Sequence, residues 1–112
     1  MAETDFERTL DEVVRDHRTG WSHDDWSRLL ATLAERGHDV TNSDRLGLEL
    51  ERRRVLDFLE QAGVAGLGPK RRTTIADRYP RLWDLRRASA ADLAALPTIP
   101  SAVAEELGAR LA

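Results

Sequence analysis

The chain has 112 residues, no cysteine and a net charge of −3, which suits one domain with or without a helical extension and excludes disulfides and thiolate metal sites. The net charge also argues against a polycation that coats nucleic acid. Because no apolar run approaches about 20 residues and the N-terminus is acidic, unlike a signal peptide, we expect a cytoplasmic protein without a membrane partner, associated with the nucleoid if bacterial.

Three helices are predicted in the first 62 residues. The pairs Thr4/Glu7 and Ser22/Asp25 have the spacing of a capping box, and a third helix begins at Asn42 or the next residue. The predicted ranges are 4–17, 22–37 and 42–62. Apolar residues recur there at three- and four-residue steps and are expected in the core: Phe6, Leu10, Val13, Val14, Trp26, Leu29, Leu30, Leu33, Leu48, Val55, Leu56 and Leu59.

Shorter helices are predicted beyond Gly63. Their ranges are 69–79, 80–87, 89–96 and 101–112. Pro69 suits the first position of a helix, Ser89 caps the third of these helices, and Trp83 is expected in the core. No segment alternates with the period of a strand, so the predicted fold class is all-α.

A positive segment lies between two acidic ones. Residues 63–88 carry seven Lys/Arg and two Asp/Glu, whereas residues 1–62 and 89–112 are both net negative. This segment is centred on the sequence GLGPKRR. Because the local field decides where an anion docks, the segment is the predicted binding region.

An internal repeat with an offset of 32 residues includes this segment. The matched pairs are Val64 and Leu96, Ala65 and Pro97, Leu67 and Ile99, Ile75 and Leu107, and Tyr79 and Leu111. We therefore expect two copies of helix, tight turn and helix, joined by the connector helix at 80–87.

Two stretches carry a family resemblance. The first stretch is VAGLGPK at 64–70, in which a hydrophobic residue, a small residue, a glycine, a hydrophobic residue and a second glycine are followed by proline and a cation. The second stretch is YPRLWDLRRASAADLAAL at 79–96, which fits the connector that follows such a hairpin. In these features residues 52–111 resemble a tandem helix-hairpin-helix domain, in particular the C-terminal module of the third subunit of bacterial excision nucleases. The resemblance implies a five-helix domain over 49–112, with an N-terminal helical region over 1–48 that packs on it or dimerises it.

The first hairpin is the candidate binding site. Gly66 and Gly68 are expected to adopt backbone angles that strain other residues, and the amides of Lys70 and Arg71 have no acceptor within their helix, so they can hold a phosphate oxygen. The resemblance implies non-specific contact with the backbone of duplex DNA across the minor groove, and a monovalent cation at this hairpin is compatible with it. The candidate residues are Gly66, Leu67, Gly68, Lys70, Arg71 and Arg72, with Arg78, Arg81 and Ser101 as secondary candidates.

The second hairpin departs from the family pattern. Thr98 and Pro100 stand where the motif has glycines, and Ala102 stands where the first copy has Lys70. Pro100 lacks an N–H group, and acidic residues follow it at Glu105 and Glu106. We therefore expect this copy to be mainly structural.

No catalytic pattern is present in the sequence. It has no Walker loop, no nucleophile elbow and no carboxylate cluster with metal-ligand spacing, and its three histidines lie on separate segments. We expect a non-enzymatic DNA-binding protein, an accessory in repair or recombination. The alternative is a protein-interaction or dimerisation module that uses a degenerate helix-hairpin-helix fold, with a homodimer or a protein partner held through the acidic N-terminal region.

Overall fold

The computed structural model describes residues 4–111, which form seven helices and no strand, and the predicted all-α class is confirmed. The predicted regions 1–48 and 49–112 include residues 1–3 and residue 112, which lie outside the described residues. The helices are α1 (Asp5–Asp16), α2 (His23–Glu35), α3 (Ser43–Ala62), α4 (Pro69–Arg78), α5 (Leu82–Arg86), α6 (Ala90–Ala94) and α7 (Ser101–Leu111). Among residues 4–111, no helix is long and apolar enough to cross a lipid bilayer.

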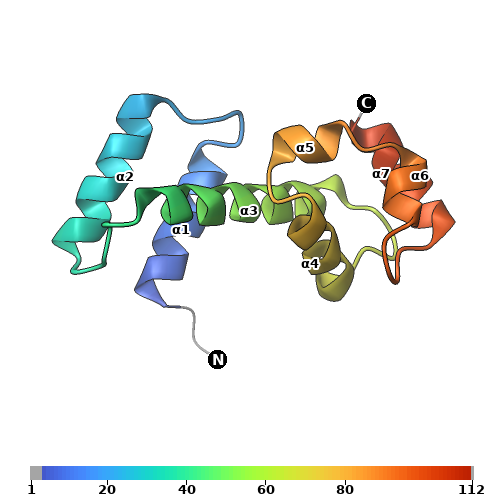
Figure 1. Ribbon diagram of the computed structural model, residues 1–112, viewed down its shortest axis with the longest axis horizontal. Coiled ribbons are helices and arrows are strands. Elements are labelled where there is room, and N and C mark those ends of the chain that lie inside the picture. The colour runs from blue at the N-terminus through green and yellow to red at the C-terminus, as the bar shows by residue number, and fades with distance from the viewer. Residues whose placement is uncertain (1–3, 112) are drawn as a thin grey trace.

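The molecule is elongated, and α3 is its axis. Figure 1 shows α1 and α2 at one end of α3 and α4 to α7 around the other end. The molecule measures 45 × 31 × 22 Å, and its radius of gyration of 15.1 Å exceeds the roughly 13 Å of a compact chain of this length. We call the two ends the N-terminal lobe (α1, α2 and the first half of α3) and the C-terminal lobe (the second half of α3 and α4 to α7).

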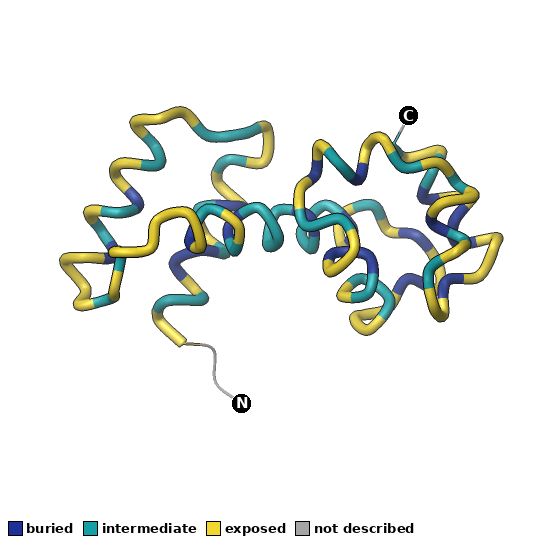
Figure 2. Tube along the Cα trace, viewed as in Figure 1, coloured by how far each residue is buried: buried dark blue, intermediate teal, exposed yellow. Residues whose placement is uncertain are grey.

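Each lobe has its own hydrophobic cluster, and α3 contributes to both. Leu46 and Leu50 are buried in the N-terminal cluster, whereas Val55 and Leu59 are buried in the C-terminal cluster. At 100° per residue, these two pairs lie on opposite faces of the helix. Figure 2 shows buried stretches of the chain at both ends of the molecule. The predicted domain boundary at residues 48/49 falls inside this continuous helix and remains a prediction.

The change of face explains why the prediction for Leu48 is wrong. The sequence pattern places Leu48 in the core, but its side chain is 46% exposed. It lies on the same face of α3 as Val55, but in the first half of the helix, where the N-terminal cluster uses the opposite face. Sequence periodicity could not show this, because it treats a helix as having one buried face throughout.

The N-terminal cluster joins α1 and α2 to the first half of α3. Its buried members are Leu10, Val14, Leu29, Leu33, Leu46 and Leu50. Trp26 packs above Gly47, where an added Cβ atom would lie 3.9 Å from the indole. Two ion pairs link α3 to α1 and to the segment just beyond it: Arg53 lies 2.9 Å from Asp11 in α1, and Arg18 beyond α1 lies 3.0 Å from Asp57. The N-terminal region therefore packs on α3.

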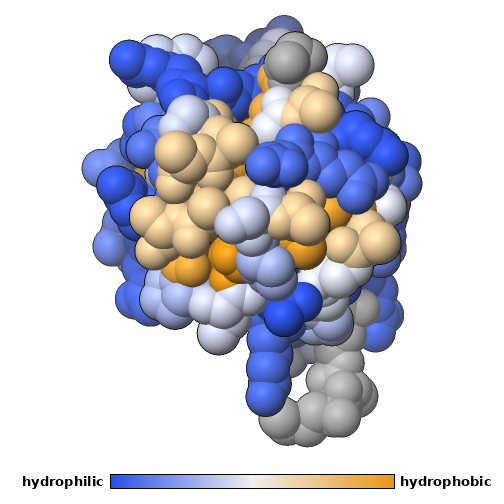
Figure 3. Space-filling view, turned by 90° about the vertical axis from the view of Figure 1, so that its right-hand side faces the viewer, coloured by the Kyte–Doolittle hydropathy of each residue, from blue (hydrophilic) through white to orange (hydrophobic). Residues whose placement is uncertain are grey.

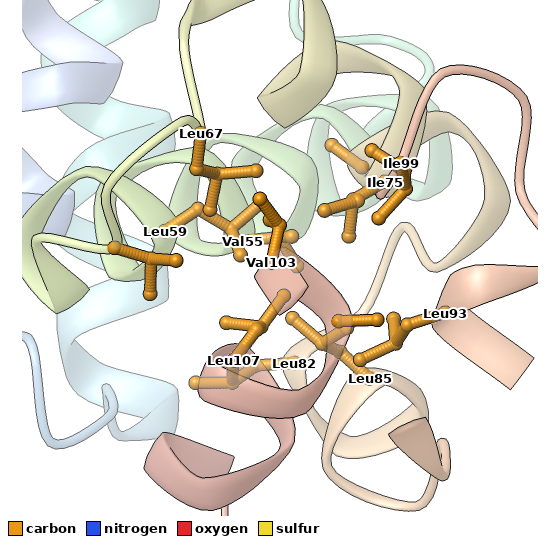
Figure 4. Close-up of a cluster of buried hydrophobic side chains, with 13 residues drawn as sticks. Val55, Leu59, Leu67, Ile75, Leu82, Leu85, Leu93, Ile99, Val103 and Leu107 are labelled. Carbon is orange, nitrogen blue, oxygen red and sulfur yellow. The ribbon is translucent and has the colours of Figure 1, made fainter. Parts of the chain in front are cut away.

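The C-terminal cluster is the larger of the two and positions the candidate site. Figure 4 shows side chains from α3, α4, α5, α6 and α7 converging on one another. Its fully buried members include Val55, Leu59, Ile75, Leu85, Leu93 and Leu107. Both turns of the sequence repeat belong to it, because Leu67 and Ile99 are 5% and 6% exposed. The turns are therefore held by the core.

The prediction for Trp83 is also wrong. Its side chain is 65% exposed, whereas Leu82 and Leu85 are buried. The short helix α5 turns one face to the core, and residues three positions apart share that face. Trp83 lies about 100° from Leu82 around the helix axis, on the outward side. The guanidinium of Arg87 covers its ring at 4.4 Å from the centroid.

Polar side chains and turn geometry fix several helix ends. At the beginning of α1, Thr4 Oγ1 accepts from the Glu7 amide, but the return bond of the predicted capping box is not formed. Ser22 accepts a hydrogen bond from the Asp25 amide while the Asp25 carboxylate accepts one from the Ser22 amide, and Ser89 and Asp92 repeat this capping box at α6. At the end of α2, Gly37 has a φ of 81°, and His38 N–H donates to the Leu33 carbonyl. This bond is typical of a Schellman motif.

The capping boxes predict sensitivity to acid. Backbone and side-chain hydrogen bonds from Ser22 and Ser89 hold the pKa values of Asp25 and Asp92 below their ordinary value of 3.8. A folded-state pKa below the unfolded value stabilises the protein above that value, and the stabilisation is lost as the pH falls through the folded pKa. We therefore expect the melting temperature to drop below about pH 4, and to drop less in an Asp25→Asn, Asp92→Asn double variant. Circular dichroism melts between about pH 2.5 and about pH 6 test this; equal slopes for both proteins would contradict it.

Candidate nucleic-acid interface

The first turn, over 64–68, has a backbone that requires glycine at one position. Gly66 has a φ of 84°, and Leu67 N–H donates to the Val64 carbonyl at 3.2 Å. A Cβ atom added to Gly66 would lie 3.2 Å from the Cγ2 atom of Val103 in α7. Gly66 is therefore needed both for its positive φ and for the close packing of the turn against α7.

Gly68 has a different role from the one predicted. Its φ of −79° and ψ of 179° are extended backbone angles that any residue adopts, so the expectation of a strained conformation is wrong at this position. It is the N-cap of α4, and an added Cβ atom would meet no atom within 4 Å. Without a side chain here, the beginning of α4 remains open to solvent.

The beginning of α4 presents free amides. The first helical bond runs from Arg72 N–H to the Gly68 carbonyl at 3.0 Å, and α4 has no side-chain cap. Pro69 occupies the first position, so the next amides are those of Lys70 and Arg71, and neither has an acceptor among the described residues. Gly68, Pro69 and Lys70 are all exposed. We call these two amides, with the exposed Lys70 side chain beside them, the amide seat.

The second turn repeats this geometry although its sequence departs from the motif. Thr98, which matches Gly66, has a φ of 66°. Ile99 N–H donates to the Leu96 carbonyl at 3.4 Å, and Ala104 N–H donates to the Pro100 carbonyl at 3.0 Å. These bonds are the 32-residue counterparts of those in the first turn. Pro100 does lack an N–H group, but Ser101 supplies one at the position of Pro69.

Arg71 joins the two turns. Its Nε donates to the Thr98 carbonyl at 2.8 Å, and one of its terminal nitrogens donates to the Gly66 carbonyl at 2.6 Å. The two turns, and with them the beginnings of α4 and α7, therefore lie next to each other. Arg72 supports the same region, since it donates to the Leu67 carbonyl at 3.2 Å. Both guanidinium groups fix carbonyl oxygens of the turns and keep their positive charge close to the amide seat.

The predicted site residues differ in what they offer to a ligand. Lys70 is exposed and, within residues 4–111, forms no ion pair. Leu67 lies in the core and its N–H is bonded, so it supports the turn and offers no group to solvent. Ser101 is exposed at the beginning of α7, in the same part of the molecule.

Arg78 and Arg81 lie elsewhere. Arg78 is the last residue of α4, about 13 Å along the helix from Pro69, and Arg81 lies beyond that end. The guanidinium of Arg78 covers the Tyr79 ring at 4.9 Å. Arg81 lines a groove between the two lobes with Trp21 and Trp83. The structure therefore does not bring these two secondary candidates to the amide seat.

The joining of the turns by Arg71 could not be found from the sequence. The run from Lys70 to Arg72 shows three cations, and nothing in it tells which one faces solvent and which two hold carbonyl groups. The repeat offset was the available signal, because it places Thr98 at the position of Gly66. Among residues 4–111, no three His, Asp or Glu side chains are grouped in a way that could hold a metal ion.

Comparison with known proteins finds a similarity to part of a larger protein. The chain is 35% identical over 81 residues to UvrABC system protein C of Geobacter metallireducens, a match that covers 70% of this chain and 12% of that protein. No family model matches the chain, and no solved structure matches it. The similarity supports a relation to a part of that protein.

Proposed function

We propose that this chain is a non-enzymatic module that holds the phosphate backbone of duplex DNA, without reading its sequence, through the amide seat at the beginning of α4. The observation that carries the proposal is the pair of amides at Lys70 and Arg71 without an acceptor, at a helix beginning where Gly68, Pro69 and Lys70 are exposed. The similarity to UvrABC system protein C supports a setting in DNA repair and supports assignment of the two turns to the tandem helix-hairpin-helix family.

Electrostatics explains why cations stand at this helix end. The beginning of a helix carries a partial positive charge, which disfavours Lys70, Arg71 and Arg72 in the free protein. A bound phosphate oxygen accepts from the amides and neutralises these charges, so the unfavourable arrangement becomes favourable in the complex. The unpaired amides and the cations thus point to the same kind of ligand, an anion.

The second turn is proposed to add a further phosphate contact. Its backbone repeats that of the first turn, and Arg71 holds the two turns together. Glu105 and Glu106 are exposed on α7 and weaken the attraction there. With one or two phosphates neutralised for each chain, log affinity is expected to fall with log salt concentration with a slope of about −1 to −2.

The experiment that tests the proposal is a fluorescence anisotropy titration of labelled duplex DNA at several salt concentrations. Lys70→Glu is expected to weaken binding about tenfold at low salt and to reduce the salt slope by about 1. Arg28→Glu is the matched control, because it makes the same change of charge at a side chain 79% exposed on α2. Equal affinities for Lys70→Glu, Arg28→Glu and the natural protein would contradict the proposal.

Lys70 also allows a test without mutation, because it is the single lysine of the chain. Duplex DNA is expected to slow acetylation of the Lys70 amine several-fold, since a phosphate next to the ammonium group covers it. Mass spectrometry of the acetylated peptides measures this rate, and the α-amino group is the internal reference. Equal protection of both amines, or of neither, would count against contact at the amide seat.

A further inference from the structure

A groove between the two lobes gathers the exposed hydrophobic side chains of this protein. Its volume is about 670 Å³, and all three tryptophans line it. It also holds Leu48 and Trp83, which are the large hydrophobic side chains that remain exposed within residues 4–111. Exposed apolar side chains gathered in one groove are typical of a surface that binds another molecule.

The groove exists because of how α3 changes its buried face. One face of α3 carries Asp44, Leu48 and Glu51 in the first half of the helix. In the second half of α3 the same face is packed against the C-terminal lobe, including α5. Trp83 of α5 lies at the edge of this packed region, where the groove begins. In Figure 1, α5 and the connection between α1 and α2 lie on the same side of α3, with the groove between them.

The charges along the groove favour a second copy of this chain as its occupant. Asp44, Glu51 and Arg54 come from α3, whereas Arg81 comes from the beginning of α5. The guanidinium of Arg54 covers the Trp21 ring at 5.4 Å from its centroid. A phosphate backbone would meet the two acidic groups, and a partner of either single sign would meet lining groups of its own sign. A second copy related by a two-fold axis places Arg81 of each chain against Asp44 of the other, so a groove with both signs complements itself.

The groove and the amide seat lie on different sides of the molecule. The seat is at the beginning of α4 and the groove is beyond its end, and Figure 1 shows the beginning of α4 below α3 and α5 above it. A copy bound in the groove therefore leaves the amide seat free.

We propose that this chain forms a two-fold symmetric homodimer through the groove, with Trp83 of each chain packed against the Leu48 side of its partner and Arg81 paired with Asp44 across the interface. The proposed function gains from this arrangement, because one dimer carries two amide seats and two weak contacts with one duplex strengthen each other. The dimer itself does not depend on DNA binding.

Sedimentation equilibrium between about 1 µM and about 500 µM protein tests the dimer, a range suited to a small interface with a micromolar dissociation constant. The natural protein is expected to approach twice its monomer mass of 12.6 kDa. Trp83→Ala, Arg81→Glu and Asp44→Lys are each expected to raise the dissociation constant at least tenfold, and Arg28→Glu is expected to leave it unchanged. Circular dichroism melts check that each variant is folded.

An equimolar mixture of Arg81→Glu and Asp44→Lys provides the sharper test. In a mixed dimer Glu at 81 faces Lys at 44, and Arg81 of the other chain faces the unchanged Asp44, so both cross-interface pairs are attractive again. The mixture is expected to recover the dimer that neither variant forms alone. A mass of 12.6 kDa for the natural protein at every concentration overturns the proposal and leaves the groove to a different protein.

A dimer that resists all three groove substitutions also overturns the proposal, because it places the interface elsewhere. The end of the molecule that carries α6 and α7 presents hydrophobic and small side chains in the middle of its surface, as Figure 3 shows. Exposed alanines occur in these helices at positions 91, 102 and 109 and just after α6 at position 95. Gly68→Asp, which targets the amide seat alone, is expected to leave the mass unchanged, so a failed dimer and failed DNA binding are distinguishable.

Discussion

Gly68→Asp is expected to weaken the binding of duplex DNA at least tenfold while the melting temperature stays the same or rises slightly. Aspartate at the N-cap accepts a hydrogen bond from an amide two or three positions on, which here are Lys70 and Arg71. Its carboxylate would occupy the amide seat and repel a phosphate. The extended backbone of Gly68 and the open space around it accept the new side chain without strain.

This prediction separates binding from folding. Aspartate is a slightly better N-cap than glycine, by a few tenths of a kcal/mol, so lost affinity could not be ascribed to lost stability. Gly68→Ala is the matched control, because it adds a side chain but neither a cap nor a charge, and it is expected to retain most of the affinity. Anisotropy titrations and thermal melts of both variants make the comparison. Full affinity in Gly68→Asp would show that DNA does not use the amide seat.

The second large effect is expected at Gly66. Gly66→Val is predicted to lower the free energy of unfolding by about 2–4 kcal/mol, because a β-branched side chain strains a backbone at positive φ. The added Cβ atom would also lie 3.2 Å from Val103, whose helix is packed by the C-terminal cluster. Urea denaturation followed by circular dichroism measures the change.

Thr98 supplies the control for this prediction. It holds a φ of 66° at the matching position of the second turn, so Thr98→Gly relieves strain in the native state while it adds freedom to the unfolded chain. These two effects oppose each other, and the net change is expected to stay below about 1 kcal/mol. A Gly66→Val variant as stable as Thr98→Gly would contradict the role assigned to the first turn.

The sequence predicts the helices well because their signals are local. The serine–aspartate pairs at 22/25 and 89/92 form the capping boxes that their spacing indicates. The repeat offset of 32 residues correctly places two turns with equivalent backbone bonds, even at Thr98, where the motif residue is replaced.

The errors come from packing at long range. The spacing of the apolar residues around them predicts that Leu48 and Trp83 are in the core. Which face of a helix is buried, however, depends on elements that are distant in the sequence. The same applies to Arg71, whose acceptor at Thr98 is 27 positions away. The DNA contacts are predictions that the proposed titrations test, and the domain boundary and the family of the two turns remain predictions.

The uninterrupted course of α3 has a geometric consequence. One continuous helix connects the two lobes, and each of its residues adds a rotation of about 100° and a rise of about 1.5 Å. The orientation of one lobe relative to the other therefore follows from the number of residues between Leu50 and Val55. Insertion of one alanine there would preserve both clusters but swing one lobe by more than a quarter turn about the axis. Trp21 and Trp83 would then no longer line a common wall.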